Sequence, residues 1–247
     1  GRSETALRTC LTSRYPRESY VLTDKLSGGF FETEADIRPF FARQLAACGV
    51  DYFDFYLMHS QNAENFQQFK ACRAYETAFD LKAEGKIRHV GLSFHDRAEV
   101  LDQILTEYPQ IEVVQIQFNY LDYDDIAVQS RKCYEVCRRH NKPVLVMEPV
   151  KGGMLATPPQ PVLDILKGAE PEASAASWAI RFAASLDGVI TVLSGMSNVE
   201  QMKDNLSFMK DFNGLSEKER ETLDQAQKAL AEIPLILCTN CNYCAKV

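Results

Sequence analysis

Short runs of β-forming residues recur along the chain about every 34 residues, which is the length of one strand–helix unit. Several runs are almost continuously apolar, as expected for strands covered on both faces. We expect six strands: Tyr20–Thr23, Phe53–Met58, His89–Leu92, Val113–Gln117, Val144–Met147 and Val189–Leu193. With a helical segment after each strand, the sheet should be parallel with right-handed crossovers. This regularity leaves two α/β folds, a doubly wound sheet or a (β/α)₈ barrel, which periodicity alone does not separate.

The segments between the strands carry helical spacing and helix-end signals. Asn198 is a candidate N-cap, and Ser216 with Glu219 has the spacing of a capping box. The polar, proline-rich stretch Thr157–Pro161 is expected to be a loop within a longer loop, Leu155–Leu166. The expected helices are Ser3–Leu11, Thr33–Ala47, Phe66–Ala83, Asp96–Glu107, Ala127–His140, Pro171–Ser185, Val199–Met209 and one that begins at Ser216.

The net charge of −7 over 247 residues argues against a protein that coats nucleic acid. The sequence contains no apolar stretch of about 18 residues, so we expect no membrane span. The polar start of the chain does not have the pattern of a signal peptide. We therefore expect a cytoplasmic protein with reduced thiols, and neither nucleic acid nor membrane as a partner.

Polar residues follow the predicted strands, where function gathers in parallel sheets. Lys25 follows the first strand and His59 the second, and these are the group types needed for proton handling near a carbonyl. The turn Ser194–Ser197 offers backbone N–H groups for a phosphate at the start of a helix. Taken singly, each has an ordinary alternative: a solvated lysine, a structural histidine, or a simple turn.

At this point the sequence resembles the aldo-keto reductase family along essentially its whole length. The motifs that carry the resemblance are GRSE, TDKL, DYFDFYLMH, GKIRHVGLSFH, VQIQFNYLD, VMEPVKGGML and SGMSNVEQMKDNL. The resemblance implies a (β/α)₈ barrel with NADPH across the carboxyl face of the strands. It also implies hydride transfer between NADP(H) and a small aldehyde or ketone.

The resemblance assigns roles to individual residues. Lys25 corresponds to the lysine that lowers the pKa of a catalytic tyrosine, and His59 to the histidine that orients the carbonyl. Met147 stands where many members stack an aromatic residue on the nicotinamide. The implied cofactor-binding residues are Ser93, Gln117, Asn119, Pro149, Gly195, Ser197, Gln201 and Asn205.

Two departures from the family pattern shape the expectation for this chain. The family's tyrosine stands directly before the segment that is Gly1–Glu4 here, and its aspartate lies further upstream. We therefore expect an incomplete barrel (strands 3–8 of the family with their helices) that reduces carbonyls poorly or not at all. The expected division is residues 1–212 for the partial barrel and 213–247 for a helix and a cysteine-rich tail.

Three cysteines in the last ten residues have the spacing C-x₂-C-x₂-C: Cys238, Cys241 and Cys244. This spacing is typical of bacterial ferredoxin motifs, whereas zinc sites more often use two separated pairs. We expect a 4Fe-4S cluster, with zinc or an unmetallated thiol cluster as alternatives. Cys133 and Cys137 lie four residues apart on a predicted helix, where burial is the simpler explanation.

Two other functions compete with carbonyl reduction. The cluster could be the working centre of an electron-transfer or redox-sensing protein, with a redox partner and the barrel as a scaffold. The chain could also be a non-catalytic regulatory subunit that binds a nucleotide. Carbonyl turnover, the cluster spectrum and nucleotide binding separate the three.

Overall fold

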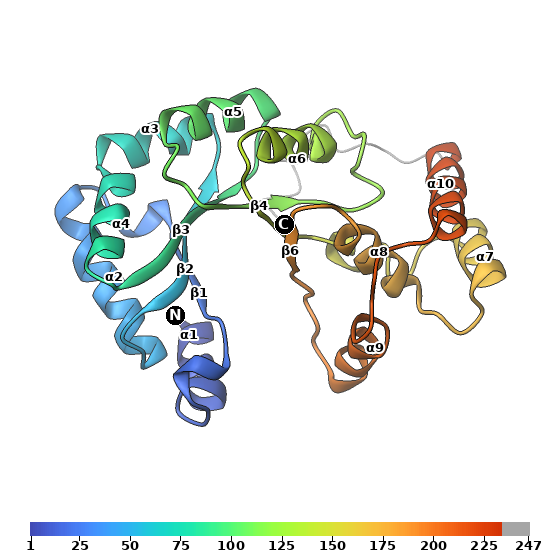
Figure 1. Cartoon of the computed structure of the whole chain (residues 1–247), viewed down its shortest axis with the longest axis horizontal. Coiled ribbons are helices and arrows are strands. Elements are labelled where there is room, and N and C mark those ends of the chain that lie inside the picture. Colours follow the sequence, from blue (N-terminus) through green and yellow to red (C-terminus); the bar gives the residue numbers. More distant parts are fainter. Residues whose placement is uncertain (234–247) are drawn as a thin grey trace, which may run out of the picture.

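The computed structural model of the protein describes residues 1–233 and contains six parallel strands paired in chain order (Figure 1). Each strand pairs with the one before it in the sequence, without the reversal of order that a doubly wound sheet requires. The order is consistent with the wall of a (β/α)₈ barrel; within the described part, β1 and β6 each pair on one side only. The strands are β1 (Thr23–Leu26), β2 (Phe53–Gln61), β3 (Ile87–Phe94), β4 (Val113–Gln117), β5 (Val144–Met147) and β6 (Val189–Val192).

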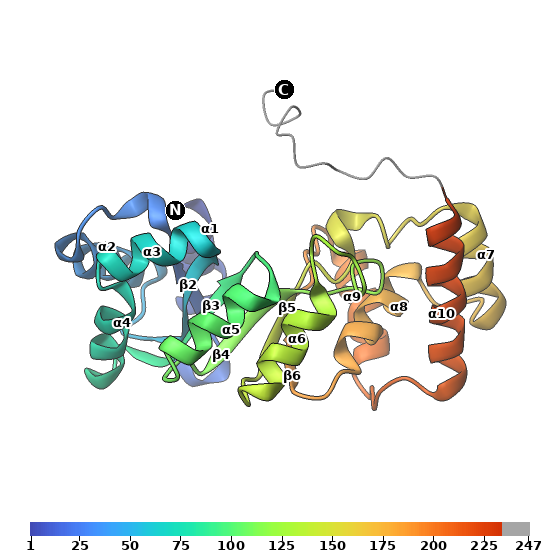
Figure 2. The ribbon, with the colours of Figure 1, turned by 90° about the horizontal axis from the view of Figure 1, so that it is seen from above.

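Helices follow the strands and lie along one side of the curved sheet (Figures 1 and 2). A short π-helical turn, Arg8–Thr12, continues the first helix. The helices are α1 (Arg2–Leu7), α2 (Glu34–Cys48), α3 (Ala63–Ala71), α4 (Ala74–Ala83), α5 (Ala98–Glu107), α6 (Ser130–Arg139), α7 (Gln160–Ala169), α8 (Ala175–Ala184), α9 (Val199–Met209) and α10 (Glu217–Glu232).

Alternation along the strands separates the two faces of the sheet. Even-numbered residues such as Tyr56, Val114 and Val146 belong to the large core between the strands and the helices. Odd-numbered residues form a smaller cluster on the other face, with Leu57 and Val113 at its centre. Among the predicted site residues, Lys25, Ser93 and Gln117 are odd-numbered strand residues, so this alternation places them on the face opposite the helices, which we call the inner face.

A second apolar cluster joins α7, α8 and α10. Trp178 on α8 is fully buried and packs with Leu166 of α7 and Leu230 of α10. Figure 2 shows α10 lying beside α7. The helix after residue 212 is therefore packed on the rest of the chain, and the division at 212/213 stays a prediction.

The predicted starts of α9 and α10 are confirmed, because their caps are local. In contrast, α8 begins at Ala175 rather than Pro171, the N-cap of α5 is Arg97 rather than Asp96, and α6 begins at Ser130 rather than Ala127. The Asn198 side chain accepts from the N–H of Gln201, and α9 has the predicted bounds. Ser216 and Glu219 form the predicted capping box at the start of α10. The strands β4 and β5 also match their predicted bounds.

Three further local predictions need correction. β1 lies three residues later than predicted, since the N–H of Leu22 donates to the Asp54 side chain and pairing with β2 begins at Thr23. The predicted helix Phe66–Ala83 is two helices, because Arg73 between them adopts a left-handed conformation with φ of 51°. The predicted loop 155–166 contains the start of α7, with Pro159 as the N-cap and Pro161 in the first turn, where proline is tolerated.

Two features are absent from the part of the chain that the structure describes. No helix within residues 1–233 is long and apolar enough to cross a membrane. The same residues include no group of three or more His, Cys, Asp or Glu side chains arranged to hold a metal ion. Cys238, Cys241 and Cys244 lie outside the described residues.

Candidate active site

Lys25 and His59 lie on neighbouring strands and line one hollow of about 580 Å³, which extends along β1 from Thr23 and is bordered by residues of α1 and α2. Lys25 pairs with Leu57 in the ladder, so His59 is two residues further along the adjacent strand. We call this the Lys25–His59 hollow; Thr23, Asp24, Ser27 and Phe30 also line it. Lys25 belongs to the paired part of β1, whereas His59 lies at the irregular end of β2, where the register shifts between Met58 and Gln61.

Hydrogen bonds from neighbouring elements hold both residues. The Ser27 hydroxyl oxygen lies 2.6 Å from Nδ1 of His59. The buried Gln44 of α2 donates from Nε2 to the carbonyl of Lys25 at 2.9 Å, and its Oε1 accepts from the Tyr56 hydroxyl at 2.6 Å. The sheet and α2 thus fix the backbone of Lys25, while Ser27 restricts the imidazole ring.

The hollow disfavours protonated side chains. Burial lowers the pKa of Lys25, although Asp24 partly opposes this. Burial also lowers the pKa of His59, helped by the positive charge of Lys25 and by His95. His59 is therefore biased toward the neutral imidazole, which can accept on one nitrogen and donate from the other.

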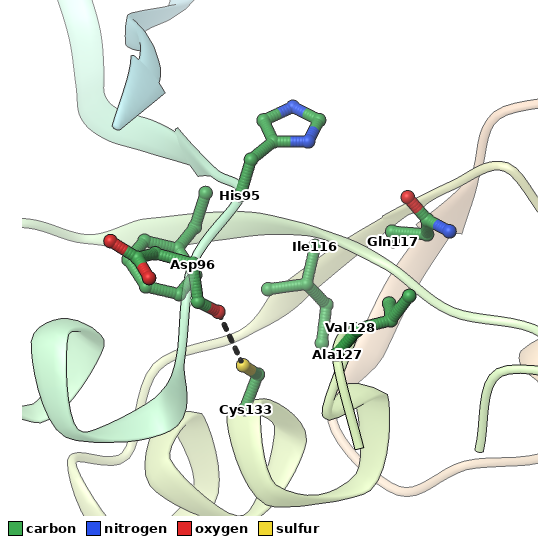
Figure 3. A pocket seen from close by; sticks show the side chains of 8 residues that line it. His95, Asp96, Ile116, Gln117, Ala127, Val128 and Cys133 are labelled. Carbon is green, nitrogen blue, oxygen red and sulfur yellow. Dashed lines mark hydrogen bonds between the residues drawn. The ribbon is translucent and has the colours of Figure 1, made fainter. Parts of the chain in front are cut away.

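His95 is a member of this charge group that the sequence reading did not place in the site. Burial and Lys25 lower its pKa, while Glu148 raises it. It follows β3 directly and lines a small pocket of about 160 Å³. Figure 3 shows His95 and Gln117 on different sides of this pocket, with the Cys133 sulfur directed at the carbonyl of Asp96. His95 is odd-numbered, like Ser93 two residues earlier, and directly follows β3. This alternation could have indicated from the sequence that His95 lies on the same face of the sheet as Ser93.

Ser93 supports the turn that follows His59. Ser60 has φ of 53°, a conformation that is costly for a residue with a side chain. Its N–H donates to Oγ of Ser93 at 2.9 Å, and Ser93 is fully buried. Ser93 itself is not among the residues that line the Lys25–His59 hollow.

A larger groove, of about 720 Å³, begins at Lys25 and runs between β5 and the start of α9. We call it the Gln115 groove; Gln115, Met147 and Pro149 line its inner part. Its outer part contains four of the predicted cofactor residues: Gly195, Ser197, Gln201 and Asn205. Lys25 lines both the groove and the hollow, so the two spaces meet at its side chain.

At the outer end of the groove the polar groups bond to one another. Gln201 Oε1 accepts from the N–H of Ser197 at 2.8 Å, and Asn205 Nδ2 donates to Oγ of Ser194 at 2.8 Å. These bonds brace the turn before α9. Lys25 is the only lysine or arginine among the described residues that line the groove.

Gln117 and Asn119 are arranged differently from the prediction. Gln117 lies outside the groove and donates to the buried carboxylate of Asp122 at 2.7 Å. Asn119 is fully buried, donates to Asp122 and to the Glu148 carbonyl, and accepts from the N–H groups of Leu121 and Asp122. All polar positions of Asn119 are used, so it has none left for a cofactor amide.

Gln115, which was not among the predicted site residues, lines the groove, whereas Gln117 does not. It is 2% exposed and donates from Nε2 to the sulfur of Met147, while its Oε1 is buried without a partner. Both glutamines are on one face of β4, so parity does not distinguish them. They are distinguished by their partners, since Gln115 contacts Met147 of β5 and Gln117 contacts Asp122.

The aldo/keto reductase family model matches residues 1–228. The chain belongs to this family. The six-stranded parallel sheet and its strand order agree with this membership.

A curated relative is the NADH-specific methylglyoxal reductase of Escherichia coli (strain K12), 26% identical over 172 residues. The match covers 63% of this chain and 50% of that protein, so the chain spans about half the length of the curated relative it matches.

Solved structures share the fold. The holo form of an aldo-keto reductase from Bacillus halodurans is 22% identical, with a TM-score of 0.67 over 90% of this chain and 76% of that one. An aldo-keto reductase from Klebsiella pneumoniae in complex with NADPH is 18% identical, with a TM-score of 0.67 over 90% and 74% of the two chains.

Proposed function

We propose that this chain forms the cofactor-binding and carbonyl-orienting part of an NADP(H)-dependent aldo-keto reductase. The observation that carries the proposal is the position of Lys25, where the Lys25–His59 hollow meets the Gln115 groove. A long groove for a dinucleotide and a short hollow for a carbonyl must meet where hydride passes. NADP(H), when bound, supplies that hydride.

The residues of the groove fit a nicotinamide cofactor in one testable respect. The unpartnered Oε1 of Gln115 is an acceptor that a carboxamide N–H could satisfy. Pro149, Gly195, Ser197, Gln201 and Asn205 would hold the rest of the cofactor, with Ser93 contributing a hydroxyl near His59. Within the groove, Gln115 replaces Gln117 and Asn119 in the proposal, for the reasons given above.

His59 would orient the substrate carbonyl. If the Ser27 hydroxyl donates to Nδ1, the proton of the neutral imidazole resides on Nε2, where it can donate to a carbonyl oxygen. Lys25 would favour the ionised form of a neighbouring phenol and so allow proton exchange near neutral pH. Among the described residues that line the hollow, none is a tyrosine.

We therefore further propose that this sequence is part of a longer reductase and turns over carbonyls poorly by itself. The test is to titrate the chain with NADPH and then add methylglyoxal, the substrate named for the E. coli relative. We expect NADPH binding without steady oxidation. Turnover at about 1 s⁻¹ or faster, an ordinary enzyme rate, contradicts the second proposal, and absence of NADPH binding contradicts the first.

Lys25→Met and Lys86→Met form a matched pair for the longer protein, since Lys86 is exposed on the loop before β3. Loss of carbonyl reduction in Lys25→Met but not in Lys86→Met supports the assignment of Lys25. Tight NADPH binding without turnover on any carbonyl, in the longer protein also, supports the regulatory-subunit alternative.

For the tail we propose a 4Fe-4S cluster that uses Cys238, Cys241 and Cys244, supported by their spacing alone. Iron and sulfide analysis after anaerobic reconstitution, with the visible absorbance spectrum, tests it. Bound zinc and a colourless protein contradict it. A cluster that exchanges electrons with a redox partner while the Lys25→Met variant behaves like the wild type favours the electron-transfer alternative.

A further inference from the structure

The buried amide of Gln115 and the sulfur of Met147 form a pair across β4 and β5. Gln115 Nε2 lies 3.0 Å from Sδ of Met147. Gln115 pairs with Leu145 in the ladder, so Met147 is its diagonal neighbour on the same face. The main chain of Met147 is fixed as well, because its carbonyl accepts from the N–H of Phe118 at 3.0 Å.

The chemistry of the thioether fixes the orientation of the amide. A thioether sulfur accepts hydrogen bonds weakly and has no proton to donate. Only the NH₂ end of Gln115 can therefore face Met147 favourably, since the flipped amide would set its oxygen against the lone pairs of the sulfur. The contact with Met147 therefore decides which end of the Gln115 amide is nitrogen and which is oxygen, because the two ends have nearly the same shape.

With the NH₂ end turned to Met147, Oε1 of Gln115 is the atom left over. It is buried and unpartnered, and the residue lines the Gln115 groove. A buried acceptor without a partner is unfavourable, so it favours a ligand that brings an N–H donor. A carboxamide supplies such a donor, whereas a carboxylate brings a second acceptor and a negative charge.

We propose that Met147 is a positioning residue that sets Gln115 as an acceptor and thereby makes the groove select a ligand ring bearing a carboxamide over one bearing a carboxylate. This inference rests on the proposed function, because it takes the ligand to be a nicotinamide dinucleotide. It assigns Met147 a specificity role through Gln115, in addition to any direct contact with the ring.

The experiment compares three ligands by calorimetry on the 247-residue chain. NADP⁺ carries the carboxamide, its nicotinic acid analogue carries a carboxylate at the same position, and adenosine 2′,5′-bisphosphate lacks the ring. The quantity of interest is the ratio of the dissociation constants of the nicotinic acid analogue and NADP⁺. We expect a ratio of at least about 10 for the wild type, the value of one hydrogen bond to a buried group.

Met147→Leu keeps the volume and removes the acceptor, and such exchanges are usually tolerated in cores. We expect it to reduce the ratio about fivefold or more, as an amide free to flip would, while binding of the bisphosphate is unchanged. Met58→Leu is the matched control: Met58 is fully buried on the helix-facing side of β2, and its replacement should leave the ratio unchanged. Gln115→Leu removes the acceptor itself and should abolish the discrimination, which keeps the proposal testable if Met147→Leu folds poorly.

The outcomes separate the two proposals. If NADP⁺ and the bisphosphate bind but the ratio is the same in the wild type, Met147→Leu and Gln115→Leu, the role of Met147 is refuted and the proposed function stands. If neither ligand binds the wild type, the proposed function fails and this inference fails with it. If Met147→Leu weakens all three ligands equally, Met147 acts on the groove as a whole and the selective role is refuted.

Discussion

The Ser27 hydroxyl oxygen lies 2.6 Å from Nδ1 of His59, joining the residue after β1 to the carboxyl end of β2. If the hydroxyl is the donor, the proton of a neutral imidazole is on Nε2, which can then donate into the hollow. It also connects the two predicted site residues, since Ser27 is two positions after Lys25.

Replacing Ser27 with alanine should release the tautomer of His59. In the wild type we expect the proton on Nε2, and in Ser27→Ala a mixture of both tautomers, because nothing then donates to Nδ1. Nitrogen chemical shifts of the imidazole at pH 8 measure this directly. Ser19→Ala, whose hydroxyl contacts only the Pro16 carbonyl, is the control and should leave the shifts unchanged.

The two imidazoles of the site should make stability fall on mild acidification. Burial and the charge of Lys25 hold the pKa values of His59 and His95 below the ordinary value near 6.5. As the pH falls below 6.5, the unfolded chain takes up these protons before the folded chain does. The contribution of the two histidines to the free energy of unfolding is therefore complete above about pH 6.5. It is lost as the pH falls toward the lower pKa values of the folded state.

Urea unfolding between pH 7.5 and 5.5 tests this direction. The double variant His59→Gln/His95→Gln should show a smaller loss of unfolding free energy across the interval than the wild type. An equal loss in both proteins would show that other groups cause it.

Gly91 should not tolerate a side chain. A Cβ at this position would lie 2.5 Å from the carbonyl oxygen of Val113 and 2.7 Å from Leu57, and the backbone of β4 cannot move away without disturbing the ladder. We expect Gly91→Ala to destabilise the fold by about 1–3 kcal/mol in chemical denaturation. Gly29→Ala is the matched control, because its Cβ would meet nothing within 4 Å; equal midpoints for the two variants would contradict the account.

Asp122 should be important for the loop between β4 and α6. Its buried carboxylate accepts from Gln117 and Asn119 and forms an ion pair with Lys151. Asp122→Ala leaves the two amides with fewer partners, and we expect a loss of about 2 kcal/mol, moderated because Lys151 can reach water. Asp124→Ala, on the same loop but exposed, should leave the denaturation midpoint nearly unchanged; a comparable loss there would contradict the role of burial.

The sequence by itself determined the features that depend on neighbours along the chain. The spacing of apolar runs predicted a parallel α/β sheet, and β4 and β5 have the bounds it indicated. Capping at Asn198 and Ser216 was readable because each side chain bonds to an N–H three residues away. The placement of Lys25 and His59 at one edge followed from parallel strands, whose carboxyl ends meet.

The tertiary structure decided what depends on partners far along the chain. The three-residue shift of β1 comes from Asp54, more than thirty residues later, which binds the N–H of Leu22. Gln115 bonds to Met147 and lines the groove, whereas Gln117 bonds to Asp122 and does not, although both glutamines belong to one strand. The order of residues along a strand specifies the face to which each side chain points. The cavity that a polar side chain lines, and whether its hydrogen bonds are already satisfied, depend on contacts with neighbouring strands and loops.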